Sequence, residues 1–183
     1  MKRLSLVLCA LLGLAGAAHA GSDKIDPSGY ICAELVALTA TDPEPPIFEA
    51  LQIDGYASAA EGAVITPTPD LLFSLVLHVN NLCQKKPGEK VLSLWRDVRT
   101  RLPLPADGDW RADTTTCKDF NDNPDNGSGF IIWLDGYNRG SNGKGSGPSL
   151  LESDAKINTF IEACKAKPEA KMLDVLRAQV KSK

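Results

Sequence analysis

The chain has 183 residues, of which 43% are hydrophobic, so it can bury a core and is not a disordered tail. Its 20 Lys and Arg against 23 Asp and Glu give a formal net charge of -3. Nucleic-acid binding requires a positively charged surface, so this acidic balance argues against nucleic acid as a partner.

The first twenty residues have the pattern of a cleaved secretory signal peptide. Two basic residues precede an apolar run over 4–18, and Ala18 and Ala20 place small residues at both positions that a signal peptidase reads. The run is too short to span a bilayer, and no later run approaches the ~20 apolar residues that a membrane helix needs. We therefore expect residues 1–20 to be removed, together with Cys9, and the mature protein to be exported without a membrane anchor.

Cleavage removes two basic residues and leaves 18 Lys and Arg against 23 Asp and Glu, a mature charge of -5. The mature chain keeps four cysteines, Cys32, Cys83, Cys117 and Cys164. An even number of cysteines in an exported protein indicates disulfides, and four cysteines allow three pairings. Without a Cys-x-x-Cys motif, and with one histidine, the mature chain lacks the residues of a zinc site, a c-type haem attachment or a thioredoxin-like pair. We expect neither a metal nor a cofactor.

An internal repeat selects one of the three pairings. Ile-Asp-Gly-Tyr at 53–56 recurs as Leu-Asp-Gly-Tyr at 134–137, and from there the two halves align without a gap at an offset of 81 residues. In this register Cys83 falls on Cys164, and the segment at 30–35 corresponds to that at 115–120. The repeat predicts disulfides Cys32–Cys83 and Cys117–Cys164. Each would close a loop of about 50 residues, which the chain-entropy account values at about 4 kcal/mol.

The first repeat unit, residues 28–101, has a helical pattern throughout. Residues 47–53 combine apolar spacings of three and four with good helix formers, so we expect a helix that ends near Gly55. Apolar residues recur at the same spacings over 70–83, with Thr68 as the N-cap and Pro69 at the first helical position. Another helix is expected to start at Pro87 and run to about residue 101.

A Pro- and Gly-containing linker at 102–112 leads to the second unit, residues 113–181. The apolar run at 130–134 precedes Asp-Gly and fits a strand entering a hairpin, but its counterpart in the first unit favours a helix ending near Gly136. A Gly/Ser-rich loop is expected at 138–148, then helices at 150–166 and from Pro168 to about 181. The sequence thus predicts an all-α protein made of two small disulfide-bridged helical domains in tandem.

The second unit combines three sequence features. They are Thr-Cys-Lys-Asp-Phe at 116–120, an aromatic segment with Trp133 and Tyr137, and Ile-Glu-Ala-Cys-Lys-Ala-Lys-Pro at 161–168. In this combination the unit resembles the HdeA/HdeB family of periplasmic acid-stress chaperones. It covers almost all of the second unit and extends to the first through the repeat. The family fold is a small disulfide-bridged helical domain. Family members usually have one unit, whereas this chain has two.

The resemblance implies ATP-independent holding of denatured periplasmic proteins at low pH, by a chaperone that partly unfolds or dissociates in acid. Below about pH 3 most carboxylates lose their charge, which takes the mature chain from about -5 to about +20. Such self-repulsion loosens compact states. The expected partners are acid-denatured periplasmic proteins. The two units are also candidates for association with each other. Apolar helical side chains and one aromatic residue are candidates for client binding: Leu71, Leu72, Leu75, Val76, Val79 and Trp133.

The alternative function is a stably folded periplasmic interaction or structural module that never opens. The same apolar stripes are ordinary helix cores in any folded domain, so they serve either function. Circular dichroism and dye binding between pH 7 and pH 2 would separate the two.

Enzymatic activity is not expected. His78 is the only imidazole of the mature chain, and its apolar helical neighbours favour a packing role. No Gly-rich phosphate loop or Ser-centred elbow occurs. The oxygen-rich segment 119–127 is similar to a calcium loop, but its glycine is misplaced and the closing Glu is absent, so we interpret it as a solvated turn.

Overall fold

The computed structural model describes residues 24–41, 44–102, 108 and 110–181. Within these ranges the chain forms eight α-helices, one short 3-10 helix and no strand beyond isolated bridges, so the all-α prediction is confirmed. None of the described helices is both long enough and apolar enough to cross a membrane. The predicted signal peptide at 1–20 and much of the predicted linker lie outside the described residues.

The first half contains four helices, α1 (Cys32–Thr41), α2 (Ile47–Glu61), α3 (Pro69–Cys83) and α4 (Val91–Arg99). The start of α3 is as predicted, because Pro69 is its first residue and the Thr68 hydroxyl accepts a hydrogen bond from Leu71 N at 3.3 Å. The start of α4 is not at Pro87, because the backbone there pairs with another segment. Pro87 O and Glu89 O accept hydrogen bonds from backbone N–H groups at the beginning of α1.

The second half contains α5 (Cys117–Asp122), α6 (Pro124–Ser141), the 3-10 helix η1 (Leu150–Glu152), α7 (Asp154–Ala166) and α8 (Met172–Lys181). The run at 130–134 is helical, as its counterpart indicated, and α6 continues to Ser141, so the following loop is shorter than expected. The single helix expected over 150–166 is divided at Ser153. This residue is extended, and its hydroxyl caps α7 by accepting from Lys156 N. Residues 119–127 are mostly helical rather than a solvated turn.

Two disulfides join the cysteines that the repeat paired, Cys32 with Cys83 and Cys117 with Cys164. Each ties the first residue of one helix, α1 or α5, to a helix of the same half, α3 or α7. The neighbouring backbone contacts also recur at equivalent positions, as antiparallel bridges between residues 31 and 90 and between residues 116 and 171. Each half is therefore closed covalently on itself.

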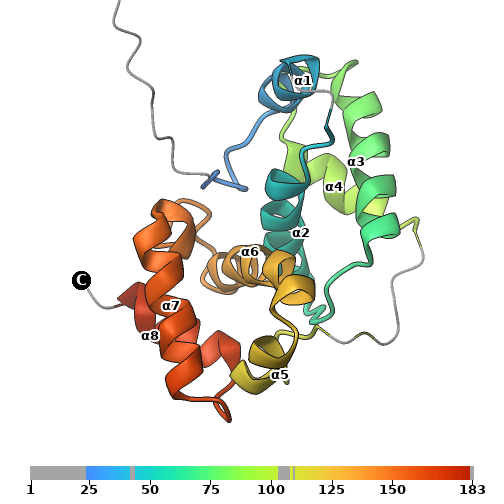
Figure 1. The fold of residues 1–183 in the computed structure, drawn as a ribbon. Coiled ribbons are helices and arrows are strands. Elements are labelled where there is room, and N and C mark those ends of the chain that lie inside the picture. The colour runs from blue at the N-terminus through green and yellow to red at the C-terminus, as the bar shows by residue number, and fades with distance from the viewer. Residues whose placement is uncertain (1–23, 42–43, 103–107, 109, 182–183) are drawn as a thin grey trace, which may run out of the picture.

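The helices α2 and α6 lie at the centre of the molecule (Figure 1). Around them, α1, α3 and α4 pack on the side of the first half, and α5, α7 and α8 on the side of the second. The contact between α2 and α6 is the most extensive between any two described helices. Buried apolar side chains from both halves form one contiguous core.

Candidate functional site

The contact between α2 and α6, called the seam below, depends on glycines of the repeated Asp-Gly-Tyr motif. A Cβ atom on Gly55 would lie 2.0 Å from Trp133 O, and one on Gly136 would lie 2.3 Å from Gln52 O. Only glycine allows backbones to approach so closely. The expectation that both glycines lie near helix ends is therefore wrong, because α2 and α6 each continue beyond their glycine to bring the helices into contact.

The aspartate beside the first glycine is fully buried and bonded across the seam. Asp54 accepts hydrogen bonds from Trp133 Nε1 of the second half at 2.8 Å and from Trp95 Nε1 of α4 at 3.0 Å. Arg99 Nη1, also buried, lies 3.3 Å from Asp54 Oδ1 and donates to Ser58 Oγ. The carboxylate thereby joins α2, α4 and α6, and its charge is paired, as burial requires.

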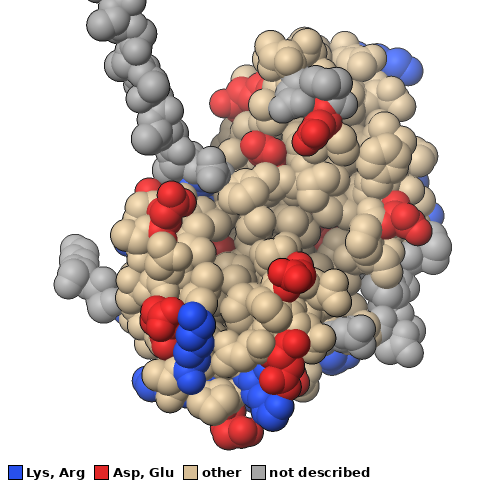
Figure 2. Space-filling model, in the orientation of Figure 1, with Lys and Arg blue, Asp and Glu red and all other residues tan. Residues whose placement is uncertain are grey.

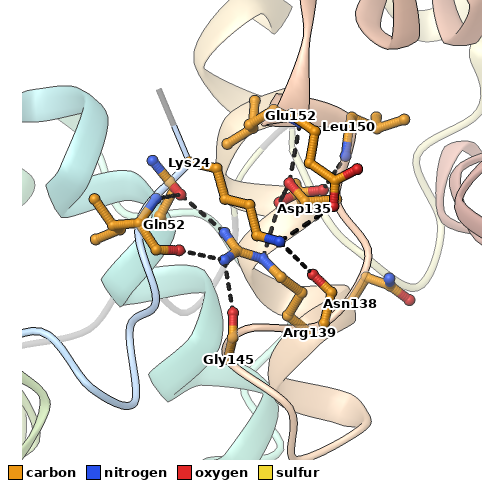
Figure 3. A network of polar contacts seen from close by, with 12 residues as sticks. Lys24, Gln52, Asp135, Asn138, Arg139, Gly145, Leu150 and Glu152 are labelled. Atoms are coloured by element: carbon orange, nitrogen blue, oxygen red, sulfur yellow. Dashed lines mark hydrogen bonds and ion pairs between the residues drawn. The ribbon is translucent and has the colours of Figure 1, made fainter. Parts of the chain in front are cut away.

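The equivalent aspartate of the second half lies at the centre of another buried network (Figure 3). Asp135 accepts from Ser149 Oγ at 2.7 Å and from Leu150 N at 2.8 Å, and Arg139 Nε lies 3.0 Å from its Oδ2. This fixes the loop after α6 against the helix. Arg139 also crosses the seam, because its Nη2 donates to Gln52 Oε1 of α2 at 2.9 Å.

Burial affects both members of the Asp135–Arg139 pair. Removal from water raises the pKa of Asp135, although the adjacent Arg139 opposes this shift. Removal from water likewise lowers the pKa of Arg139, against the attraction of Asp135. In both cases the low-dielectric surroundings disfavour the charged form more than the partner charge favours it.

A groove opens along the seam where the first turns of α2 approach α6. It consists of two adjoining hollows of about 570 and 540 Å³ that share Ile47, Leu51 and Gly129 in their walls. The other apolar walls come from prolines and from large side chains such as Trp110 and Phe130. Residues other than Lys, Arg, Asp and Glu form most of the middle of the face in Figure 2. Two carboxylates, Glu44 and Glu49, also line the first hollow, so the groove is mostly apolar with acidic side chains in one wall.

The predicted client-binding residues are mostly inside the core. Leu72, Leu75, Val76, Val79 and Trp133 are each less than 5% exposed. Leu71 is half-buried and packs against the same core. Of the six, Leu72 also lines the groove, and Trp133 stacks beneath it on Phe130 with ring centroids 5.9 Å apart. The structure thus places Trp133 at the seam and Leu72 in the wall of the groove, and the other four residues elsewhere on α3.

The remaining sequence candidates lie apart from the seam. His78 is exposed on α3, with Nδ1 2.7 Å from Ser74 O, so its expected packing role is wrong. The Asp119 carboxylate forms part of the capping box at the start of α5, where it accepts a hydrogen bond from Thr116 N. Among the described residues, no group of three or more His, Cys, Asp or Glu side chains is arranged to hold a metal ion.

Sequence reasoning did not identify the buried polar residues of the seam. Asp54, Asp135, Arg99 and Arg139 are polar residues at core positions, which periodicity does not select. A signal was nevertheless present, because the Asp-Gly pair is identical in both repeats where most of their flanking residues differ.

Comparison of the chain with protein-family models, with curated proteins and with solved structures finds no match.

Proposed function

We propose that this protein is a periplasmic, ATP-independent acid-stress chaperone that exposes apolar surface at low pH and holds denatured proteins. The observation that supports this most is the apolar groove at a seam that no disulfide crosses. Both disulfides join helices within one half, whereas α2 and α6 meet through packing and hydrogen bonds. The halves can therefore separate while each keeps its covalent tie.

Acid supplies a force for such separation. Residues 21–101 contain seven Lys and Arg, and residues 102–183 contain eleven. Below about pH 3 most carboxylates are neutral, so both halves become strongly cationic and repel each other. Opening at the seam would widen the groove and uncover Trp133, which is fully buried in the resting fold. The faces of Leu75, Val76 and Val79 would follow only if the first half itself loosened.

Several carboxylates of the second half stabilise the fold only while they are ionised. Hydrogen bonds from Thr116 lower the pKa of Asp119, the Arg111 guanidinium lowers that of Asp113, and Lys156 lowers that of Glu152. A carboxylate with a lowered folded-state pKa adds stability above its unfolded pKa of about 4, and this stability is lost as the pH falls through the folded value. These three groups therefore favour loosening in acid.

The proposed location in the periplasm rests on two features. The two disulfides are consistent with an extracytoplasmic compartment, where such bonds form and persist. The expected signal peptide at 1–20 supports export to that compartment.

The test is suppression of client aggregation by the mature full-length chain at pH 2–3, measured by light scattering. A functional chaperone reduces scattering in proportion to its concentration, with dye binding that rises over the same pH range. Ile47→Lys and Ile132→Lys place a charge in the wall of the groove and should weaken suppression. Leu77→Lys is the matched control, because Leu77 is 46% exposed on α3 and does not line the groove. Unchanged client aggregation at pH 2–3 would reject the proposal.

One observation favours the alternative, a stable interaction module. Because burial raises the folded-state pKa of Asp135, its ionised form destabilises the fold above the unfolded pKa, and protonation on acidification removes that penalty. This group therefore opposes acid unfolding. For a stable module, near-ultraviolet circular dichroism would keep its neutral-pH signal down to pH 2, and no dye would bind.

A further inference from the structure

A second cleft, distinct from the groove at the seam, lies at the C-terminal end of α6 in the second half. It has a volume of about 790 Å³ and is bounded by the end of α6, the following loop, the start of α7 and the end of α8. It shares no lining residue with the groove. Its size is within the range of about 300–1,000 Å³ that is typical of small-molecule sites.

The cleft is positively charged although the mature protein is acidic. One carboxylate, Glu152, is among the lining residues, together with five cations: Arg139, Lys144, Lys156, Arg177 and Lys181. Arg139 is paired with Asp135, and Lys156 with Glu152. The other three have little compensation. No described carboxylate is within ion-pair distance of Lys144 or Lys181, and Arg177 is 3.9 Å from an exposed Asp174.

We propose that this cleft binds a small molecule with a phosphate or carboxylate group. Lys144, Arg177 and Lys181 hold the anionic group. The site is independent of client holding, because it lies in the second half and needs no opening of the seam.

Titration calorimetry of the mature full-length chain at pH 7 and low salt tests the site with four probes. Glycerol 3-phosphate, glycerate and inorganic phosphate should bind, and glycerol, which has no charge, should not bind. The double variant Lys144→Glu and Arg177→Glu should lower the affinity for glycerol 3-phosphate about tenfold or more, since two favourable charges become repulsive. The control, Lys85→Glu with Lys86→Glu, makes the same charge change on exposed residues outside the cleft and should have no effect.

The proposal is overturned if no probe binds, if glycerol binds as well as glycerol 3-phosphate, or if the control pair weakens binding as much as the cleft pair. The two charge substitutions are at an exposed lysine and a half-buried arginine, so neither removes a side chain from the core.

Discussion

The side chain of Asp54 connects three helices, α2, α4 and α6. Its carboxylate bonds Trp95 and Trp133, and Arg99 is its buried counter-ion. Asp54→Asn should therefore lower the free energy of unfolding by about 3 kcal/mol, because it removes the buried counter-charge of Arg99 and leaves only Glu61, at 3.9 Å. Urea unfolding at pH 7 measures the change. The control is Asp97→Asn, which breaks an exposed pair with Arg101 and should cost less than about 0.5 kcal/mol. Equal losses in the two variants would contradict the assigned role.

Asp119 shows how a single exposed residue links stability to pH. Thr116 lowers its pKa through the capping box at the start of α5. Asp119→Asn should reduce stability by about 1 kcal/mol at pH 5–7, the usual value of a helix cap. The difference from the wild type should shrink as the pH falls below about 4, because the wild-type carboxylate is then protonated too. Urea midpoints measured from pH 7 to pH 3 test this, and a difference independent of pH would exclude it.

At the scale of elements, the close approach of α2 and α6 makes a specific demand on Gly136. Gly136→Ala would place a Cβ 2.3 Å from the backbone oxygen of Gln52, so the helices must move apart. Overpacking of this kind costs about 1–3 kcal/mol, which outweighs the gain of up to about 1 kcal/mol that Ala normally gives inside a helix. Gly129→Ala is the control in the same helix, because its nearest neighbour, Leu51 Cδ1, lies at 3.5 Å. Thermal unfolding should show opposite signs for the two variants.

The elements that the sequence predicted well are those with local causes. The start of α3 follows from Thr68 and Pro69, and α7 ends near its predicted position. Predictions of helix ends were wrong where contacts with a backbone segment distant in sequence determine the local structure. Pro87 was expected to begin a helix, but its carbonyl is bonded to α1. Likewise, the local sequence around Gly55 predicts a helix end. The close contact of Gly55 with the backbone of Trp133 explains why a glycine lies inside the helix instead.

At the scale of the whole molecule, the repeat predicted which cysteines pair but not how the two halves meet. Pairing is a property of each half, and equivalent positions in the sequence identify it. At the seam, positions that are equivalent in the two repeats carry different side chains. Gln52 of α2, for example, aligns with Trp133 of α6. Helical periodicity locates a buried face without stating which helix covers it. The groove and the basic cleft both depend on such non-local contacts.

If repulsion between two cationic halves opens the seam, salt must oppose the opening. Raising ionic strength from 0.1 M to 1 M shortens the Debye length from about 10 Å to about 3 Å, which screens most of the repulsion between the halves. The pH midpoint at which near-ultraviolet circular dichroism changes should therefore move to lower pH in 1 M potassium chloride. Asp54 and Trp133 are buried at the seam, so the tryptophan signal reports on the contact that opens. The urea midpoint at pH 7, measured at the same two salt concentrations, is the control for general salt effects. An acid midpoint that stays unchanged or rises would mean that the loss of local caps and ion pairs, rather than charge repulsion, loosens the fold.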